Sequence, residues 1–234
     1  MMKVLVSDYD RTLYRNDEEI KLNVESINKF IKNNNIFIIA TGRSELDIKT
    51  VIKKYNINYN YLIVNHGASI IKNDKVIYNV SIDNNIKNNI LEILKNYKYS
   101  DLFVCTKENS RANITEPNLT KIHVTFNNKN MTSFIKKLLE DKYSKFVNIY
   151  FASQGSSLEI VPASVGKVIA LDYLSELENF DKNLIYTVGD DISDKCMLEK
   201  YNGYAIDSAI KEIKETIPNK CTSVFDLANT LNKE

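Results

Sequence analysis

Short runs of apolar residues, rich in Val and Ile, constrain the fold of this chain more than any other feature of its sequence. Uninterrupted runs of this kind are typical of strands that are buried on both faces, as in a parallel sheet. The runs are Lys3–Ser7, Ile36–Ala40, Tyr61–Val64 and Leu184–Val188. We therefore predict a parallel sheet that contains these segments as strands.

Helical patterns lie between these runs. Residues 22–32 place apolar side chains at helical spacing, and the segment 44–47 (Ser-Glu-Leu-Asp) fits a capping box before a second such stretch. Residues 68–80 predict a hairpin that turns at Asn73-Asp74. Residues 167–177 predict a helix before the last run. Strands and helices that alternate in this way define a wound α/β unit.

The middle of the chain has a different pattern. Two helical stretches, 84–97 and 132–139, occur among strand-like runs without any strand–helix–strand crossover. Those runs are Leu102–Thr106, Lys121–Phe126, Phe146–Ser153 and Ser156–Val161. Such a pattern predicts an inserted α+β domain. We expect an α/β fold in which residues 1–83 and 165–234 form a Rossmann-like core of wound parallel sheet, and residues 84–164 form the insertion.

The composition argues against several classes of protein. Lys and Arg number 31 and Asp and Glu number 30, so a net charge of +1 disfavours a general nucleic-acid or polybasic membrane binder. Three cysteines without a Cys-x-x-Cys pair disfavour a thiolate zinc site and fit reduced thiols. No signal peptide and no apolar run of membrane-spanning length is evident. We therefore expect a soluble protein of the cytoplasm.

Acidic and hydroxyl residues follow three of the predicted strands, at the point where each strand ends. The segments are Asp8–Thr12, Thr41–Arg43 and Gly189–Asp194. Wound parallel sheets bind ligands just beyond the carboxyl ends of their strands. We therefore expect these segments to meet at one edge of the sheet.

Five carboxylates in these segments are expected to converge. They are Asp8, Asp10, Asp190, Asp191 and Asp194. Close carboxylates repel one another and raise one another's pKa values, and a divalent cation resolves that conflict. Oxygen ligands without a nearby histidine favour Mg²⁺. Lys167 is the natural partner for a phosphate beside the cation, and Thr41 and Gly42 offer further anion-binding groups at a helix start.

These motifs together resemble those of the haloacid dehalogenase-like phosphohydrolases, and more narrowly those of the Cof-type, type IIB members, which carry a large inserted α/β cap. The resemblance spans essentially the whole chain. Residues 8–13 (Asp-Tyr-Asp-Arg-Thr-Leu) match the first motif and Thr41–Arg43 the second. Lys167 matches the third motif and Gly189–Asp194 the fourth.

The resemblance implies a Mg²⁺-dependent phosphatase that hydrolyses small phosphomonoesters, sugar phosphates first, through an aspartyl-phosphate intermediate. Asp8 would be the nucleophile, and Asp10 would protonate the leaving group and then activate water. The implied phosphate-binding residues are Thr41, Gly42, Arg43, Lys167 and Ser193. The implied metal ligands are Asp8, the main-chain carbonyl of Asp10, Asp190 and Asp194. The implied partner is a small phosphorylated metabolite, with no nucleic acid and no membrane, and the oligomeric state stays open.

The sequence departs from the family pattern at four places that bear on substrate positioning. Arg11 stands where the family usually has Gly, and Ser193 stands where it has Asn. Asn65-His66-Gly67 replaces Asn-Gly, which leaves open whether Asn65 or His66 takes the place of the Asn. Residues 207–209 (Asp-Ser-Ala) replace a late Gly-Asn-Ala loop.

Alternatives remain beside the phosphatase. A signalling receiver domain is disfavoured by the length of the chain and by Asp10, whereas a phosphomutase of the same fold and a catalytically weak sugar-phosphate-binding regulator both stay open. The cap is expected to set specificity and to move about hinges near 81–84 and 162–167. Arg111, Asn113 and Lys121 are candidates to face the substrate, and His123 is expected to be a packed or surface residue.

Overall fold

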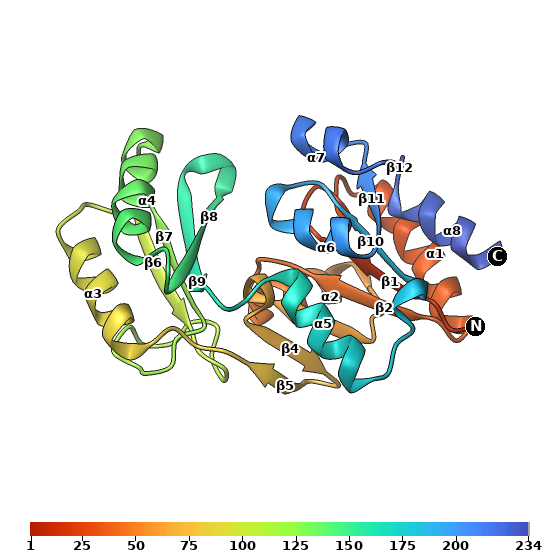
Figure 1. The fold of residues 1–234 in the computed structure, drawn as a ribbon, viewed down its shortest axis with the longest axis horizontal. Helices are drawn as coiled ribbons and strands as arrows, with labels where there is room; N and C mark the ends of the chain where they lie inside the picture. Colours follow the sequence, from red (N-terminus) through yellow and green to blue (C-terminus); the bar gives the residue numbers. More distant parts are fainter. Residues whose placement is uncertain (234) are drawn as a thin grey trace.

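The computed structural model describes residues 1–233, and its strands form two separate β-sheets (Figure 1). The larger sheet has the strand order β12-β11-β10-β1-β2-β3-β4-β5. Its strands are β1 (Val4–Ser7), β2 (Ile36–Ala40), β3 (Tyr61–Val64), β4 (Ser69–Lys72), β5 (Lys75–Asn79), β10 (Ile185–Gly189), β11 (Asn202–Ile206) and β12 (Asn219–Cys221). The strands from β12 to β3 in this order run parallel, and β4 and β5 add an antiparallel hairpin. The predicted α/β fold with a wound parallel sheet is confirmed.

The elements predicted from local patterns occur where expected. The four apolar runs are β1, β2, β3 and β10, and they supply much of the main hydrophobic core. Asn73 and Asp74 take φ values of 49° and 60°, the left-handed conformation that a tight hairpin turn needs and that Asn and Asp tolerate. Ser44 caps the second helix, because its hydroxyl oxygen accepts from the backbone N–H of Asp47 at 3.4 Å.

Within residues 1–233, six helices alternate in the sequence with strands of the larger sheet or follow its last strand. They are α1 (Glu19–Lys32), α2 (Glu45–Tyr55), α5 (Lys167–Leu177), α6 (Lys195–Lys200), α7 (Lys211–Thr216) and α8 (Val224–Lys233). The helix predicted at 22–32 begins one turn earlier, at Glu19. The parallel strands β11 and β12 were not predicted, since neither forms an apolar run of the kind that marks β1 and β2.

A second, four-stranded sheet lies between α3 and α5 in the sequence. Its strands, in the order β6-β7-β9-β8, are all antiparallel. They are β6 (Asp101–Cys105), β7 (Lys121–Thr125), β8 (Val147–Ala152) and β9 (Ser157–Pro162), and α3 (Asn84–Lys95) and α4 (Lys129–Tyr143) lie on the outer side of this sheet (Figure 1). The chain enters this part through residues 80–83 and returns through residues 163–166.

The two faces of the four-stranded sheet differ in chemistry. Ile122 and Ile160 belong to a hydrophobic cluster with side chains of α3 and α4, separate from the cluster around the larger sheet. Lys121, His123 and Glu159 alternate with these apolar residues along β7 and β9, so they lie on the opposite face. That polar face is turned toward the larger sheet.

No helix within residues 1–233 is both long enough and apolar enough to cross a membrane.

Substitution of Gly203 by Ala tests how tightly α6 packs on the larger sheet. A Cβ atom at Gly203 in β11 would lie 2.0 Å from the carbonyl oxygen of Leu198, and backbone cannot rotate away. We expect Gly203→Ala to lower the free energy of unfolding by roughly 3 kcal/mol in urea denaturation. The control is Gly166→Ala, because a Cβ there would meet only the Ile169 side chain at 3.9 Å. That control should cost about 1 kcal/mol or less, and equal losses would contradict the packing argument.

Candidate active site

The carboxyl ends of β1 and β10 meet where the winding of the larger sheet changes direction. From β1 the sheet extends through β2 and β3 on one side and through β10 and β11 on the other. Such a switch point leaves a crevice at the carboxyl ends of the strands. Asp8 follows β1 and Asp190 follows β10, and the backbone N–H of Asp8 donates to the carbonyl oxygen of Val188 at 3.0 Å. The sheet therefore holds the two carboxylates close together.

Three buried carboxylates form a compact cluster around Lys167. Oxygen atoms of Asp8, Asp190 and Asp194 all lie within 4.8 Å of one another. The Nζ atom of Lys167 donates to Oδ1 of Asp8 and to Oδ1 of Asp194, each at 2.6 Å. Oδ2 of Asp194 accepts from the backbone N–H groups of Asp190 and Asp191, each at 3.1 Å. These bonds fix Asp194 and the lysine beneath the ends of both strands.

The electrostatics of this cluster follow from burial and mutual repulsion. Burial raises the pKa of Asp8 well above its ordinary value, Asp194 and Asp190 raise it further, and Lys167 opposes them. Burial and Asp194 raise the pKa of Asp190 to about 6. Burial alone would lower the pKa of Lys167, but Asp194 and Asp8 outweigh it, so that pKa is raised. Lys167 bonds to two of the three carboxylates, and the more exposed Arg11 lies 3.4 Å from the third, so two positive charges face three carboxylates and the cluster favours an additional cation.

The donor set fits Mg²⁺. All three side chains offer carboxylate oxygens, which Mg²⁺ prefers, and ligands at about 2.1 Å in octahedral geometry stand at most about 4.2 Å apart. The oxygen separations within 4.8 Å are compatible with that spacing after small rotations of the side chains. The side chains of Asp8, Asp190 and Asp194 would hold the ion, and the main-chain carbonyl of Asp10 as a further ligand stays a prediction.

Asp10 and Asp191 line the same cavity, but their side chains are not members of the cluster. Both carboxylate oxygens of Asp10 accept from the guanidinium group of Arg43, at 2.8 and 2.6 Å. The Asp191 side chain accepts from the backbone N–H of Ile192 and caps the short turn that follows β10. Three of the five expected carboxylates converge, whereas Asp10 pairs with Arg43 and Asp191 with the backbone of the next residue.

Arg11 and Ser208, which both lie where the sequence differs from the family pattern, contact one another. Arg11 has a φ of 63°, a left-handed conformation that costs a residue with a side chain about 1–2 kcal/mol. Its guanidinium group donates to the carbonyl oxygen of Ser208 at 2.9 Å, and the Ser208 hydroxyl donates to the carbonyl oxygen of Arg11. Arg11 also lies 3.4 Å from Asp190. These contacts offset the strain of placing Arg where the family has Gly.

A cavity of about 620 Å³ lies above the cluster. Thr41, Gly42, Arg43, Ser193 and Lys167 line it, so all five expected phosphate-binding residues share one cavity with Asp8 and Asp10. The backbone N–H of Arg43 donates to the hydroxyl oxygen of Thr41 at 3.1 Å, which orders this loop. The guanidinium group of Arg43 binds Asp10, as described above.

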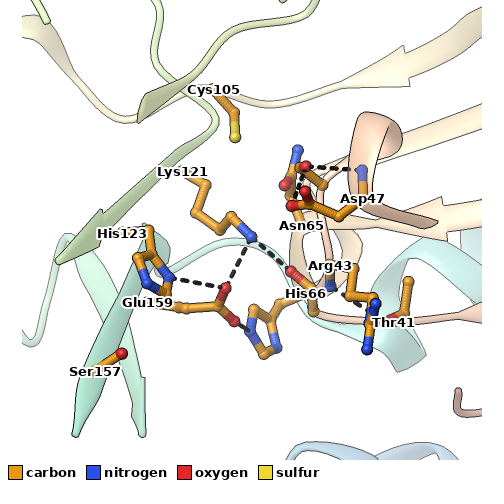
Figure 2. A network of polar contacts seen from close by, with 12 residues as sticks. Thr41, Arg43, Asp47, Asn65, His66, Cys105, Lys121, His123, Ser157 and Glu159 are labelled. Carbon is orange, nitrogen blue, oxygen red and sulfur yellow. Dashed lines mark hydrogen bonds and ion pairs between the residues drawn. The ribbon is translucent and has the colours of Figure 1, made fainter. Parts of the chain in front are cut away.

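The four-stranded sheet supplies the opposite wall of the cavity. His123 and Glu159 come from its polar face, the end of β8 and the turn after it add residues 151–155, and His66 comes from the loop after β3. Figure 2 shows Glu159 between Lys121, His123 and His66. Glu159 belongs to none of the catalytic motifs, although a charged residue between apolar neighbours in a strand indicates a buried polar contact.

The structure also gives the positions of the four residues of the insertion that the sequence singled out. His123, expected as packed or exposed, lines the cavity. Arg111, Asn113 and Lys121 are not among the residues that line it. Arg111 pairs with Asp47 of α2 at 2.9 Å, and its guanidinium carbon lies 3.7 Å from the ring centre of Phe103. Arg111 therefore joins the insertion to α2.

Comparison of the sequence with models of known protein families identifies the family of this chain. The model of the haloacid dehalogenase-like hydrolases matches residues 5–112 and 99–226 of the chain. The protein is therefore a member of the haloacid dehalogenase-like hydrolase family, and it is an enzyme. The structure of a HAD/COF-like hydrolase of Plasmodium vivax is similar to that of this chain, with a TM-score of 0.86 at 16% identity and with 99% of this chain and 96% of that one covered.

Two further relatives extend over nearly the whole chain. A candidate phosphatase of Buchnera aphidicola is 26% identical over 94% of this chain and 91% of its own length. The sucrose-phosphatase of Synechocystis, solved in complex with sucrose and phosphate, has a TM-score of 0.72 at 16% identity, with 100% and 98% of the two chains covered. The structural likeness shows that the fold is shared.

Asp190 provides a test of the crowded carboxylates. A carboxyl group whose folded pKa is raised stabilises the fold only at low pH, and this contribution is lost as pH rises through about 6. At pH 7.5 we expect Asp190→Asn to raise the free energy of unfolding of Mg²⁺-free protein by roughly 1–3 kcal/mol, and the gain should vanish near pH 4. Mg²⁺ should raise the Tm of the wild type and not that of the variant. Asp191→Asn is the matched control, and an equal effect from it would contradict the cluster.

Proposed function

We propose that this hydrolase is a Mg²⁺-dependent phosphatase of small phosphomonoesters, sugar phosphates first. The observation that carries the proposal is the buried group of Asp8, Asp190 and Asp194 around Lys167 at one wall of a cavity. It combines a nucleophile, oxygen ligands for a cation and a fixed positive charge. The name of the Buchnera relative supports phosphatase activity, and the sucrose-phosphatase supports sugar phosphates as the first class to test.

In the proposed first half-reaction, a carboxylate oxygen of Asp8 attacks phosphorus, and the bond between phosphorus and the leaving oxygen breaks. Asp10 donates a proton to that oxygen. Lys167, the Thr41 hydroxyl and the backbone N–H of Gly42 bind the phosphoryl oxygens. Bound Mg²⁺ supplies positive charge against the phosphoryl oxygens and the carboxylates.

In the second half-reaction, Asp10 takes a proton from water, the water oxygen attacks phosphorus, and the bond to Asp8 breaks. Inorganic phosphate leaves, and both aspartates return to their starting states. Asp10 suits this work because its side chain is outside the buried cluster and lines the cavity. In this structure both of its carboxylate oxygens accept from Arg43, so one of these two bonds has to open before Asp10 can carry the proton that it donates.

We also propose that residues 84–164 act as a cap over a core made of residues 1–83 and 165–234, with the linking segments as hinges. Polar contacts that join the two parts include Arg111 with Asp47 at 2.9 Å, Lys121 with the carbonyl oxygen of Gly42 at 2.8 Å, and Glu159 with His66 at 2.6 Å. Closure of the cap would exclude water while the aspartyl-phosphate forms. The cap residues at the cavity would then set specificity.

Release of inorganic phosphate from a panel of sugar phosphates tests the function. We expect release that requires Mg²⁺ and that falls by more than about 10³-fold in Asp8→Asn, because the nucleophile is lost. Hydrolysis by pure protein that EDTA does not affect would contradict the metal assignment. Transfer of the phosphoryl group to a sugar, with no phosphate released, would identify a phosphomutase. Tight binding without turnover would identify a regulator.

Asp10→Asn separates the two aspartates. A nitrophenolate leaving group needs little protonation, so the burst of nitrophenolate from p-nitrophenyl phosphate should persist in this variant. Phosphorylation by alkyl phosphates should slow by about 10²–10⁴-fold, the usual contribution of a general acid. Rapid-quench measurement of phosphoenzyme checks both steps. Equal losses on the two substrates would argue against Asp10 as the acid.

A further inference from the structure

His66 lies on a loop that packs directly against the predicted phosphate-binding loop. Asn65, His66 and Gly67 join β3 to β4 with φ values of 51°, 56° and 96°. The backbone N–H of His66 donates to the carbonyl oxygen of Thr41 at 3.1 Å, and that of Asn65 donates to Arg43 at 2.9 Å. The structure thus places the His66 side chain beside the reacting centre, at the position where the sequence departs from its family.

The His66 ring is tightly held. A Cβ atom at Gly42 would lie 2.5 Å from both Cε1 and Nε2 of the ring, so the imidazole rests on Gly42. Tyr150 of β8 stacks on it with ring centres 4.3 Å apart and planes 16° apart. The side chain is 9% exposed and lines the cavity. Its orientation is therefore set before any ligand binds.

The partners of Glu159 fix the tautomer of His66. Nε2 of His66 lies 2.6 Å from Oε2 of Glu159, and Lys121 and His123 approach Oε1 at 2.8 and 3.4 Å (Figure 2). Burial raises the pKa of Glu159, but Lys121, His123 and His66 together hold it well below its ordinary value, so Glu159 is a carboxylate. Burial lowers the pKa of His66, so its ring is neutral. Nε2 must then carry the proton, and Nδ1 carries a lone pair.

Nδ1 of His66 is a buried acceptor with no hydrogen-bond partner among residues 1–233. A buried polar atom without a partner costs about 1–3 kcal/mol, and such atoms are rare in folded proteins. The other orphaned atom on this loop, Oδ1 of Asn65, belongs to a residue that does not line the cavity. Of these two residues only His66 lines the cavity, and its Nδ1 atom is itself closed to solvent in this structure.

We propose that Nδ1 of His66 accepts a hydrogen bond from a hydroxyl group of the substrate's leaving group. This inference rests on the proposed phosphatase function and narrows the substrate class to phosphate esters of sugars and other polyols. Phosphate oxygens do not suit the position, because a lone pair repels them. A cationic donor gains little there, because Lys121 already pairs with Glu159. A neutral hydroxyl group is the donor that fits.

Two substrates and two variants test this role. We expect the wild type to prefer glycerol 3-phosphate over n-propyl phosphate in kcat/KM, and both His66→Phe and His66→Asn to reduce that preference by roughly 3–10-fold. Phe keeps the stacking shape without the nitrogen, and Asn suits the left-handed backbone. The ratio of the two substrates is independent of the fraction of folded enzyme. An unchanged ratio in both variants would overturn the inference while leaving the phosphatase intact. A wild type that hydrolyses no phosphate ester would overturn both.

Nitrogen-15 NMR gives a readout that needs no turnover. The chain contains two histidines, so the spectrum holds two imidazoles, and His123→Phe assigns them. We expect His66 to be neutral with the proton on Nε2, and its Nδ1 signal to shift on addition of a hydroxylated, non-hydrolysed phosphonate in Mg²⁺. A proton on Nδ1 would overturn the proposal.

Discussion

The pairing of the Lys167 ammonium group with the carboxylates of Asp8 and Asp194 is the interaction on which the rest of this structure depends. Asp8 follows β1, Asp194 lies in the turn after β10, and Lys167 opens α5. None of these groups could be buried alone, because an uncompensated charge in a protein interior costs several kcal/mol. The pairing therefore fixes α5 over the ends of the central strands, at the residue where the chain has just returned from the four-stranded sheet.

The sequence predicts the central strands of the larger sheet better than its edge strand β12, for a physical reason. Strands β1, β2 and β10 are covered on both faces, so burial alone selects a continuous apolar run. Strand β12 lies at the edge of the sheet, and Asn219 and Lys220 in it are exposed, so no comparable selection acts there. The sequence also predicts the hairpin turn at Asn73, because Asn and Asp tolerate the left-handed backbone conformation that this turn needs.

The site divides in the same way. Asp8 and Asp190 could be placed together because each follows a strand, and parallel strands end at one edge. The pairing of Asp10 with Arg43 and of Glu159 with His66 could not be foreseen. Each depends on how segments distant in the sequence approach one another, which no spacing encodes. The sequence shows that the Asn65-His66-Gly67 loop differs from the family pattern, but it does not show that His66 pairs with Glu159.

The two-faced character of the four-stranded sheet has an evolutionary consequence. The side chains that hold this sheet on α3 and α4 and those that face the cavity alternate along β7 and β9. Neighbouring codons therefore come under different selection, one set for stability and the other for the ligand. Exchange of a residue such as His123 alters the chemistry of the cavity wall and leaves Ile122 and Val124 in their packing. Substitutions on one face of the sheet can thus change the cavity wall while the packed face of the same strands stays constant.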